Sequence, residues 1–218
     1  MGISDFYYER HLPHSLKGGL FLFITKCVEG AYDERLYMHH AVRMTQSANF
    51  AEMWSKDPTI RKRQESRYLL KIREDYIDQN PTGSVRLDRP EVAQIIFDSI
   101  LSEENRTMNT YAFCLMRNHY HWVVKIYERD EAGAEIVLPR LFQRLHSYWS
   151  FRINQIDGVK GRRVWQRETF DKIIRDGNHL ERSINYTKNN PVKAGLVDDY
   201  EKWPYLMMRP VTESVPSL

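Results

Sequence analysis

The chain has 218 residues, 42% of them hydrophobic and 12% aromatic, which suits one globular domain with a core and excludes a disordered chain. Its net charge of +3 permits nucleic-acid binding but does not require it. Cys27 and Cys114 lie in apolar runs and indicate buried free thiols in a reducing compartment. Because the sequence has no membrane-length apolar run and no signal-peptide pattern, we expect a cytoplasmic protein.

The first third of the chain predicts a strand followed by helices. Residues Gly19–Val28 form a continuous apolar, β-rich run that is typical of a central strand. The segment from about 31 to 86 is rich in charged residues at helical spacing, and turn residues end it at Asn80-Pro81-Thr82-Gly83, so we expect a helical insertion there. Arg89-Pro90-Glu91 then opens another helix, with proline in its first turn.

The remainder predicts a hairpin, a long helix, a strand and a last helix. Strands are expected at Thr110–Met116 and from His119 to about Tyr127. An amphipathic helix follows at Leu138–Ile156, and Val164–Ile174 reads mostly as a strand. The last helix is expected to start at Asn178, with Glu181 completing a capping box, and to stop at about Asn190 because Pro191 follows.

This order of elements predicts an α+β fold. We expect a ferredoxin-like (RRM-like) antiparallel sheet with helices on one face. The whole chain, residues 1–218, is expected to form a single domain with the helical insertion at about 31–86 and a loose tail from about 206.

His119-Tyr120-His121 is the most informative segment. Alternate side chains of a strand point to one face, so both imidazoles would converge there as metal ligands, and Lys125 would share that face. Tyr120 and Trp122 would face the core. Two of eight histidines at this spacing can arise by chance, so the pair alone favours a structural or exposed role.

Tyr186 and Asn190 form a second candidate group. They are four residues apart on the last predicted helix and therefore project together, beside an apolar seam formed by Leu180, Ile184 and Thr187. Among thirteen tyrosines, this position alone does not select Tyr186.

Four segments resemble one protein family. MRNHYHWVV (116–124) resembles the M-P-N-H-x-H block of HUH nucleases of the single-tyrosine transposase type, with Arg117 where proline is common. WQRE (165–168) with IIRD (173–176) resembles the next block, and INYTKNNPVKAGLV (184–197) resembles the Y-x-x-x-N-P-V-K-A-G-L-V block of REP-associated tyrosine transposases. The opening RHLPHSLKGGLFLFIT (10–25) is also similar, so the resemblance covers nearly everything except the insertion.

The resemblance implies the HUH variant of the ferredoxin-like fold and a metal-dependent DNA endonuclease and strand transferase. His119 and His121 would bind a divalent ion, Mg²⁺ or Mn²⁺, with Asn190 as a third, amide ligand. Tyr186 would be the nucleophile that forms a phosphotyrosine intermediate on single-stranded or hairpin (REP-type) DNA. A self-contained monomer is favoured over a homodimer, and no family role extends to the insertion.

DNA contacts are expected from basic residues near these blocks, with Trp165 either stacking on a base or lying in the core. The candidates are Arg117, Lys125, Arg162, Arg163 and Arg167. Two alternatives stay open: a domesticated hairpin-binding protein that does not cleave DNA in the cell, and a metal-dependent hydrolase in which Tyr186 only positions water.

Overall fold

The computed structural model describes residues 18–32, 56–167, 169–211, 213 and 215. The start of the N-terminal motif, before residue 18, and residues 33–55 of the predicted insertion lie outside the described residues. No described helix is long and apolar enough to cross a membrane.

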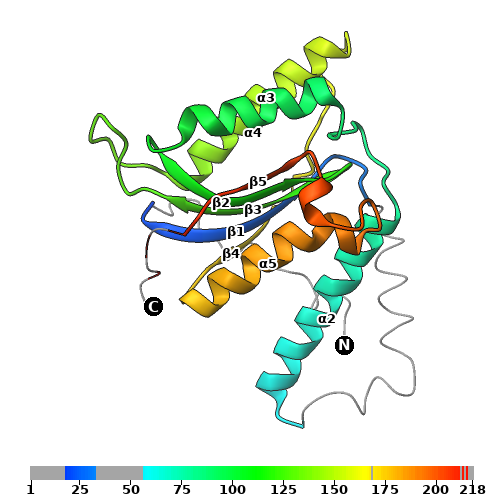
Figure 1. The fold of residues 1–218 in the computed structure, drawn as a ribbon, viewed down its shortest axis with the longest axis vertical. Coiled ribbons are helices and arrows are strands. Elements are labelled where there is room, and N and C mark those ends of the chain that lie inside the picture. Colours follow the sequence, from blue (N-terminus) through cyan, green and yellow to red (C-terminus); the bar gives the residue numbers. More distant parts are fainter. Residues whose placement is uncertain (1–17, 33–55, 168, 212, 214, 216–218) are drawn as a thin grey trace.

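The core of the protein is a five-stranded sheet in the order β4-β1-β3-β2-β5, in which all neighbouring strands are antiparallel (Figure 1). The succession β1-α3-β2-β3-α4-β4 is that of a ferredoxin-like fold. The predicted α+β class with an antiparallel sheet is therefore confirmed. The strands are β1 (Leu20–Cys27), β2 (Met108–Leu115), β3 (His119–Ile126), β4 (Phe170–Ile173) and β5 (Leu206–Met208).

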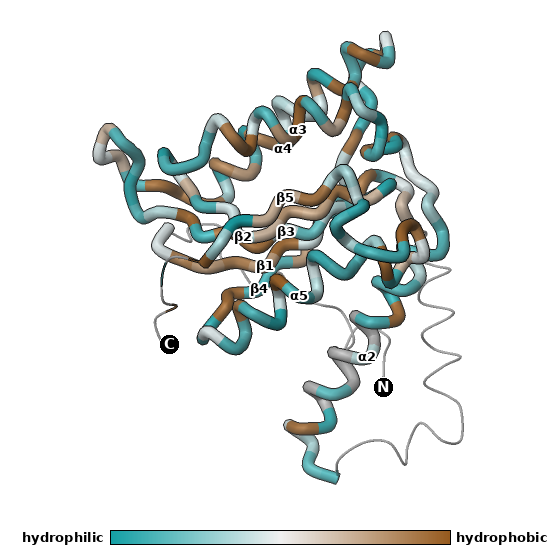
Figure 2. Tube along the Cα trace, viewed as in Figure 1, coloured by the Kyte–Doolittle hydropathy of each residue, from teal (hydrophilic) through white to brown (hydrophobic). Residues whose placement is uncertain are grey.

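Helices cover both faces of this sheet, whereas we predicted helices on one face. Helices α3 (Pro90–Glu103) and α4 (Leu138–Ile156) lie over one face, and α5 (Gly177–Lys193) lies over the other, with α2 (Pro58–Gln79) beside it (Figure 1). The reason is that the central strands carry apolar residues on both sides. Figure 2 shows that these strands are mostly hydrophobic along their length. Leu22 and Ile24 of β1 join the core under α3 and α4, whereas Phe21 and Phe23 join a second cluster that Leu180 of α5 closes.

The ends of α5 differ from the prediction. Asp176 caps this helix by accepting a hydrogen bond of 2.7 Å from the His179 backbone N–H, so the helix begins before Asn178. It also passes through Pro191 and ends at Lys193. A proline removes one N–H donor, but its fixed φ is compatible with a helix, which here continues for only two further residues.

Two other segments differ from the prediction. Residues Leu206–Met208, expected to begin a loose tail, form β5 and cover the edge of β2 through pairs such as Ala112 with Met208. Among the described residues of Val164–Ile174, only Phe170–Ile173 forms a continuous strand. A short 3-10 helix, Tyr200–Lys202, precedes β5.

The described part of the insertion is α2, and hydrogen bonds tie its end to the hairpin. Asp57 caps its first turn, and the Asn80 backbone N–H closes its last turn onto Tyr76. The side-chain amide of Asn118, between β2 and β3, donates to the backbone carbonyls of Ile77 and Asn80 at 3.3 and 3.2 Å. The insertion is thereby anchored next to the histidine strand.

Glu103, at the end of α3, gives a prediction for acid stability. Burial alone would raise its pKa, but hydrogen bonds from Arg144 (2.6 Å) and Thr107 (2.7 Å) outweigh burial and lower the pKa. This stabilisation is present above the unfolded pKa and is lost as pH falls through the lower folded value. Glu103→Gln should therefore reduce the free energy of unfolding by about 1–3 kcal/mol at pH 7.

Urea unfolding at pH 7 and at pH 3 tests this prediction, because the difference between the two proteins should shrink at the lower pH. Glu91→Gln, on the same helix but half exposed, is the matched control and should change stability by less than about 0.5 kcal/mol. A difference for Glu103→Gln that does not depend on pH would contradict the assigned role.

Candidate functional site

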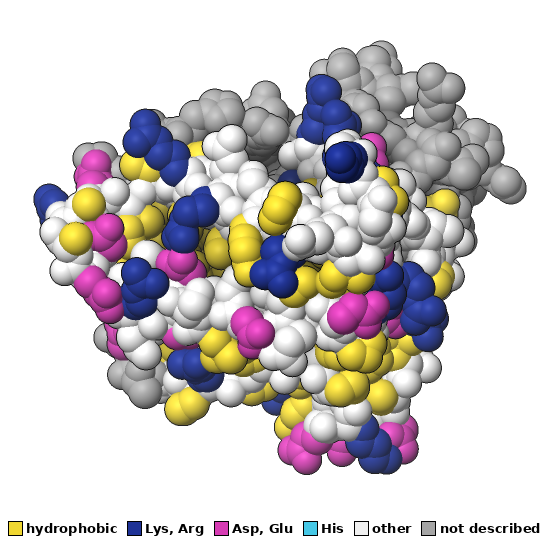
Figure 3. All heavy atoms as spheres, turned by 90° about the horizontal axis from the view of Figure 1, so that it is seen from above, with side chains coloured by type: hydrophobic (Ala, Val, Ile, Leu, Met, Phe, Trp, Pro, Cys, Tyr) yellow, Lys and Arg dark blue, Asp and Glu magenta, His cyan; other side chains and the backbone are white. Residues whose placement is uncertain are grey.

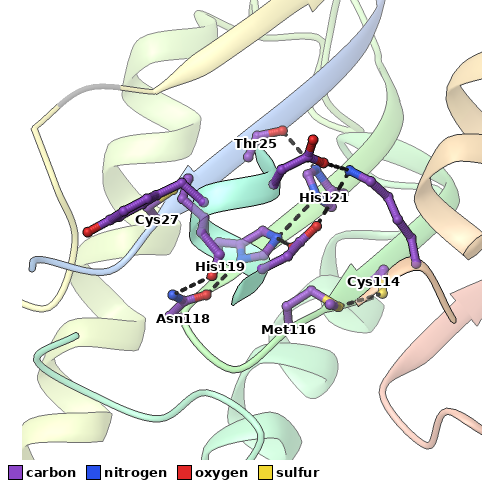
Figure 4. Close-up of polar contacts among 12 residues, drawn as sticks. Thr25, Cys27, Cys114, Met116, Asn118, His119 and His121 are labelled. Carbon is purple, nitrogen blue, oxygen red and sulfur yellow. Dashed lines mark hydrogen bonds and ion pairs between the residues drawn. The ribbon is translucent and has the colours of Figure 1, made fainter. Parts of the chain in front are cut away.

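The imidazoles of His119 and His121 converge on the α5 face of β3. Their Nε2 atoms are 3.1 Å apart, and both residues are at most 2% exposed. Figure 4 shows the two rings pointing toward one another, with Asn118 beside His119 and Thr25 beside His121. The alternation of the strand therefore produces the geometry that the sequence pattern predicts.

Neighbouring hydrogen bonds assign the proton of His119. Because the Asn118 NH₂ group donates to two backbone carbonyls of α2, its oxygen faces His119 Nδ1, at 2.8 Å. An amide oxygen only accepts, so Nδ1 carries the proton and Nε2 of a neutral His119 presents a lone pair. Thr25 Oγ1 lies 2.8 Å from His121 Nδ1 and can either donate or accept.

Electrostatics keep both rings neutral. Burial, followed by the positive charges of Arg73 and Lys193, lowers the pKa of His119 to about 3. Burial, His119 and Lys193 hold the pKa of His121 well below its ordinary value. Neutral imidazoles are the form that binds metal ions.

The pair fits a divalent ion. Ligands at about 2.0–2.2 Å from an octahedral ion lie roughly 3 Å apart when they are neighbours, close to the 3.1 Å between the two Nε2 atoms. Each ring is also oriented by an oxygen at its other nitrogen, as metal-binding histidines commonly are. Within the described part of the chain, however, no three His, Cys, Asp or Glu side chains are already arranged as a complete metal site.

Tyr186 of α5 lies against the histidine pair. Its ring meets that of His121 edge-on, with centroids 5.1 Å apart, and meets Phe23 at 5.7 Å. Its hydroxyl is buried without a hydrogen-bond partner among the described residues. Burial, followed by the negative charge of Glu74, raises the pKa of Tyr186 far above its ordinary value. Attack by this hydroxyl would therefore require a cation or a proton acceptor.

Asn190 lies one turn beyond Tyr186 on α5 and is 1% exposed. Both atoms of its amide group are buried without a hydrogen-bond partner among the described residues. A buried unsatisfied amide is costly, and the oxygen of this amide is therefore available to bind a ligand.

Sequence reasoning missed the acidic side of the site, which comes from α2. Asp78 Oδ1 lies 3.6 Å from His119 Nε2, and Lys193 of α5 bridges Asp75 at 2.7 Å and Asp78 at 3.6 Å. Burial raises the pKa of Asp78 to about 7. Glu74 and Asp78 are four residues apart on one helix face, but that spacing is common on solvated helices and would not single them out.

A small hollow lies beside the histidine pair, where the end of α2 meets the β2–β3 link and the end of α5. Asp78 and His119 line it together with Arg117. Arg117 also pairs with Asp88 at 3.4 Å and is 42% exposed. Among the predicted DNA-binding residues, Arg117 is thus placed beside the site.

Two of the predicted DNA-binding residues, Trp165 and Arg162, have partners within the protein. Trp165 is 7% exposed and packs against Tyr120, His146 and Trp149 in the core under α4, on the face opposite the histidine pair. Arg162 pairs with Asp157 and hydrogen-bonds Asn154 at 3.0 Å and the Ser84 carbonyl at 3.2 Å. The sequence did not reveal that these partners would occupy both side chains.

The other basic candidates are not gathered at the histidine pair. Lys125 shares the face of β3 but lies four residues, about 13 Å, beyond His121, and it pairs with Glu213. Arg163 and Arg167 are exposed, and Arg163 lies 3.8 Å from Glu29. On the surface above α3 and α4, basic side chains are scattered singly among acidic and apolar ones (Figure 3).

One similarity in sequence agrees with the motif resemblance. No protein-family model matches the chain. A Haemophilus influenzae protein named "Putative REP-associated tyrosine transposase" is 30% identical over 106 residues, which are 47% of this chain and 60% of that protein. A solved structure of a REP-associated tyrosine transposase bound to a REP hairpin has 14% identity and a TM-score of 0.47, covering 91% of this chain and 82% of that one. The chain is thus similar to REP-associated tyrosine transposases, over about half its length in sequence.

The position of Trp165 gives a prediction. Trp165→Ala should lower the free energy of unfolding by about 3–5 kcal/mol, because it would leave a cavity among buried aromatic rings. Urea denaturation measures this, and exposed Arg163→Ala is the control, expected to cost less than about 0.5 kcal/mol. A stable Trp165→Ala protein with weakened single-stranded DNA binding would restore the stacking role.

Proposed function

We propose that this protein is a metal-dependent HUH endonuclease and strand transferase, similar to REP-associated tyrosine transposases, that acts on single-stranded or hairpin DNA. One observation carries the proposal. The Tyr186 ring contacts His121, with centroids 5.1 Å apart, and the Nε2 atom of His121 converges with that of His119. Tyr186, as the proposed nucleophile, thus lies next to the two proposed metal ligands on one face of the sheet.

His119, His121 and Asn190 would hold the divalent ion, Mg²⁺ or Mn²⁺. The lone pair of His119 Nε2 and the unpartnered amide of Asn190 support these roles. When bound, the ion would polarise a phosphate oxygen and offset the charge that builds up in the transition state. Nitrogen ligands favour Mn²⁺, whereas abundance favours Mg²⁺.

In the proposed reaction the Tyr186 oxygen forms a bond to phosphorus. The bond from phosphorus to the 3′ oxygen breaks, leaving a free 3′ hydroxyl and a phosphotyrosine linkage. The Tyr186 proton must leave, and we propose that it passes to the Glu74 carboxylate, whose negative charge raises the pKa of this hydroxyl. The linkage conserves the phosphodiester bond energy, so the strand can be rejoined to another 3′ hydroxyl.

The DNA would follow the exposed basic residues nearest to this site. Arg117 is the strongest candidate for a phosphate contact because it lines the same hollow as His119. Arg163 and Arg167 are exposed and available for contacts further along the strand. We propose a monomer that acts in the cytoplasm.

Covalent catalysis can be tested on a denaturing gel. The protein is incubated with labelled single-stranded DNA carrying a hairpin from the flanks of its own gene, with Mn²⁺ or with EDTA. We expect a Mn²⁺-dependent protein–DNA band that Tyr186→Phe abolishes and that Tyr148→Phe, a tyrosine on α4 across the sheet, leaves intact. Cleavage without a covalent band would favour the hydrolase, and binding with neither would favour a DNA-binding protein.

The orienting role of Thr25 gives a separate prediction. Thr25→Val removes the hydroxyl that lies 2.8 Å from His121 Nδ1, so Mn²⁺ affinity should fall roughly 10- to 100-fold. Thr25→Ser keeps the hydroxyl and should bind Mn²⁺ like the unaltered protein. Electron paramagnetic resonance of free Mn²⁺ gives the affinity without DNA, and equal affinities for the two variants would exclude this role.

A further inference from the structure

We propose that Asp78, on helix α2, is a ligand of the metal ion held by the histidine pair, so that the insertion takes part in the site. The inference rests on the proposed function and deepens it, because it adds a charged ligand from outside the motifs shared with the similar family.

The first observation is an unsatisfied carboxylate. The Asp78 side chain is 6% exposed, and neither of its oxygens has a hydrogen-bond partner among the described residues. The ion-pair contact with Lys193 Nζ is 3.6 Å long, and Lys193 is already engaged with Asp75 at 2.7 Å. A buried carboxylate without hydrogen bonds is strongly unfavourable, so this position calls for a further cation.

The second observation is the atom that Asp78 faces. Its Oδ1 lies 3.6 Å from His119 Nε2, which bears a lone pair because Asn118 holds the proton on Nδ1. Nε2 of His121 is 3.1 Å from the same atom. A carboxylate oxygen and an imidazole lone pair repel one another in a low-dielectric interior, whereas a cation between them would attract both.

The third observation is that one side chain holds both groups. Asn118 donates to the carbonyls of Ile77 and Asn80, which flank Asp78, and its oxygen orients His119. Asp78 is therefore kept in register with the histidine pair and does not approach it by chance. Asp78 and His119 also line the same small hollow.

The three proposed ligand residues, His119, His121 and Asp78, are not yet close enough together to bind one ion. Neighbouring ligands of a small divalent ion lie roughly 3 Å apart, so the 3.6 Å between Asp78 and His119 must shorten when the ion binds. Rotation of the carboxylate achieves this, since no hydrogen bond restrains it. The added negative charge would tighten ion binding and compete with the DNA phosphate for the charge of the ion.

The test measures Mn²⁺ binding to the full chain without DNA, by electron paramagnetic resonance, together with the thermal midpoint with and without Mn²⁺. Asp78→Ala should weaken Mn²⁺ binding at least tenfold and abolish most of the Mn²⁺-induced rise in the midpoint. Asp78→Asn keeps the shape but not the charge and should give an intermediate affinity. Asp75→Asn, which removes the other partner of Lys193, is the matched control and should change the affinity less than threefold.

The metal-free midpoint separates a ligand from a structural ion pair. A ligand role predicts that Asp78→Asn leaves the metal-free midpoint unchanged or raises it, because a buried charge is removed. A lowered midpoint together with unchanged Mn²⁺ affinity would overturn the inference, as would a protein that binds no Mn²⁺. If Mn²⁺ binding depends on Asp78 but no Tyr186 adduct forms with DNA, the site is real and the proposed function fails.

Discussion

The candidate site depends on the register between β1 and β3. In this register Thr25 is paired with His121 across the two strands, and the threonine hydroxyl meets the imidazole nitrogen that faces away from His119. Side chains alternate between faces, so a slip of β1 by one residue would bring Lys26 opposite His121 and turn the Thr25 hydroxyl to the other face. Such a slip is unfavourable because the apolar residues of β1 would have to change places, those of each core moving into the other.

The two cores have different roles on the two faces of the sheet. Under α3 and α4, Tyr120 and Trp122 pack with Trp149 and hold the strand rigidly. On the α5 face the same strand presents its imidazoles to a helix that carries Tyr186. A part-buried hydrogen bond of 2.7 Å joins Tyr120 to His146 on the face under α3 and α4, and it gives His146, which had no partner in the sequence analysis, a structural role.

Much of this arrangement could be predicted from local sequence. Strong periodicity gave the boundaries of α4 at Leu138 and Ile156, and the alternation in β3 placed both histidines on one face. The four-residue spacing of Tyr186 and Asn190 placed them on one side of a helix. Each of these inferences needs only neighbours in the chain, which is why they hold without knowledge of the packing.

What local sequence does not show depends on partners distant in the chain. Trp165 packs against Trp149 and Arg162 pairs with Asp157, while the DNA contacts of both residues stay predictions. Helix α5 covers the second face because β1 carries apolar residues on both sides. The continuous apolar run implies that both faces of β1 are covered, but it does not reveal which helix covers the second face. Asp78 reaches the histidines only because the end of α2 lies next to the start of β3.

Asn118 contacts both His119 and the end of α2, so the insertion could not be deleted without affecting the site. Its two amide hydrogens bind carbonyls of α2. Without that helix, the carboxamide would be free to turn over and present NH₂ to His119. The ring would then shift its proton to Nε2, and an atom built to receive a cation would instead repel it. The backbone of α2, far from the motifs in sequence, thus selects the chemical form of a side chain on β3.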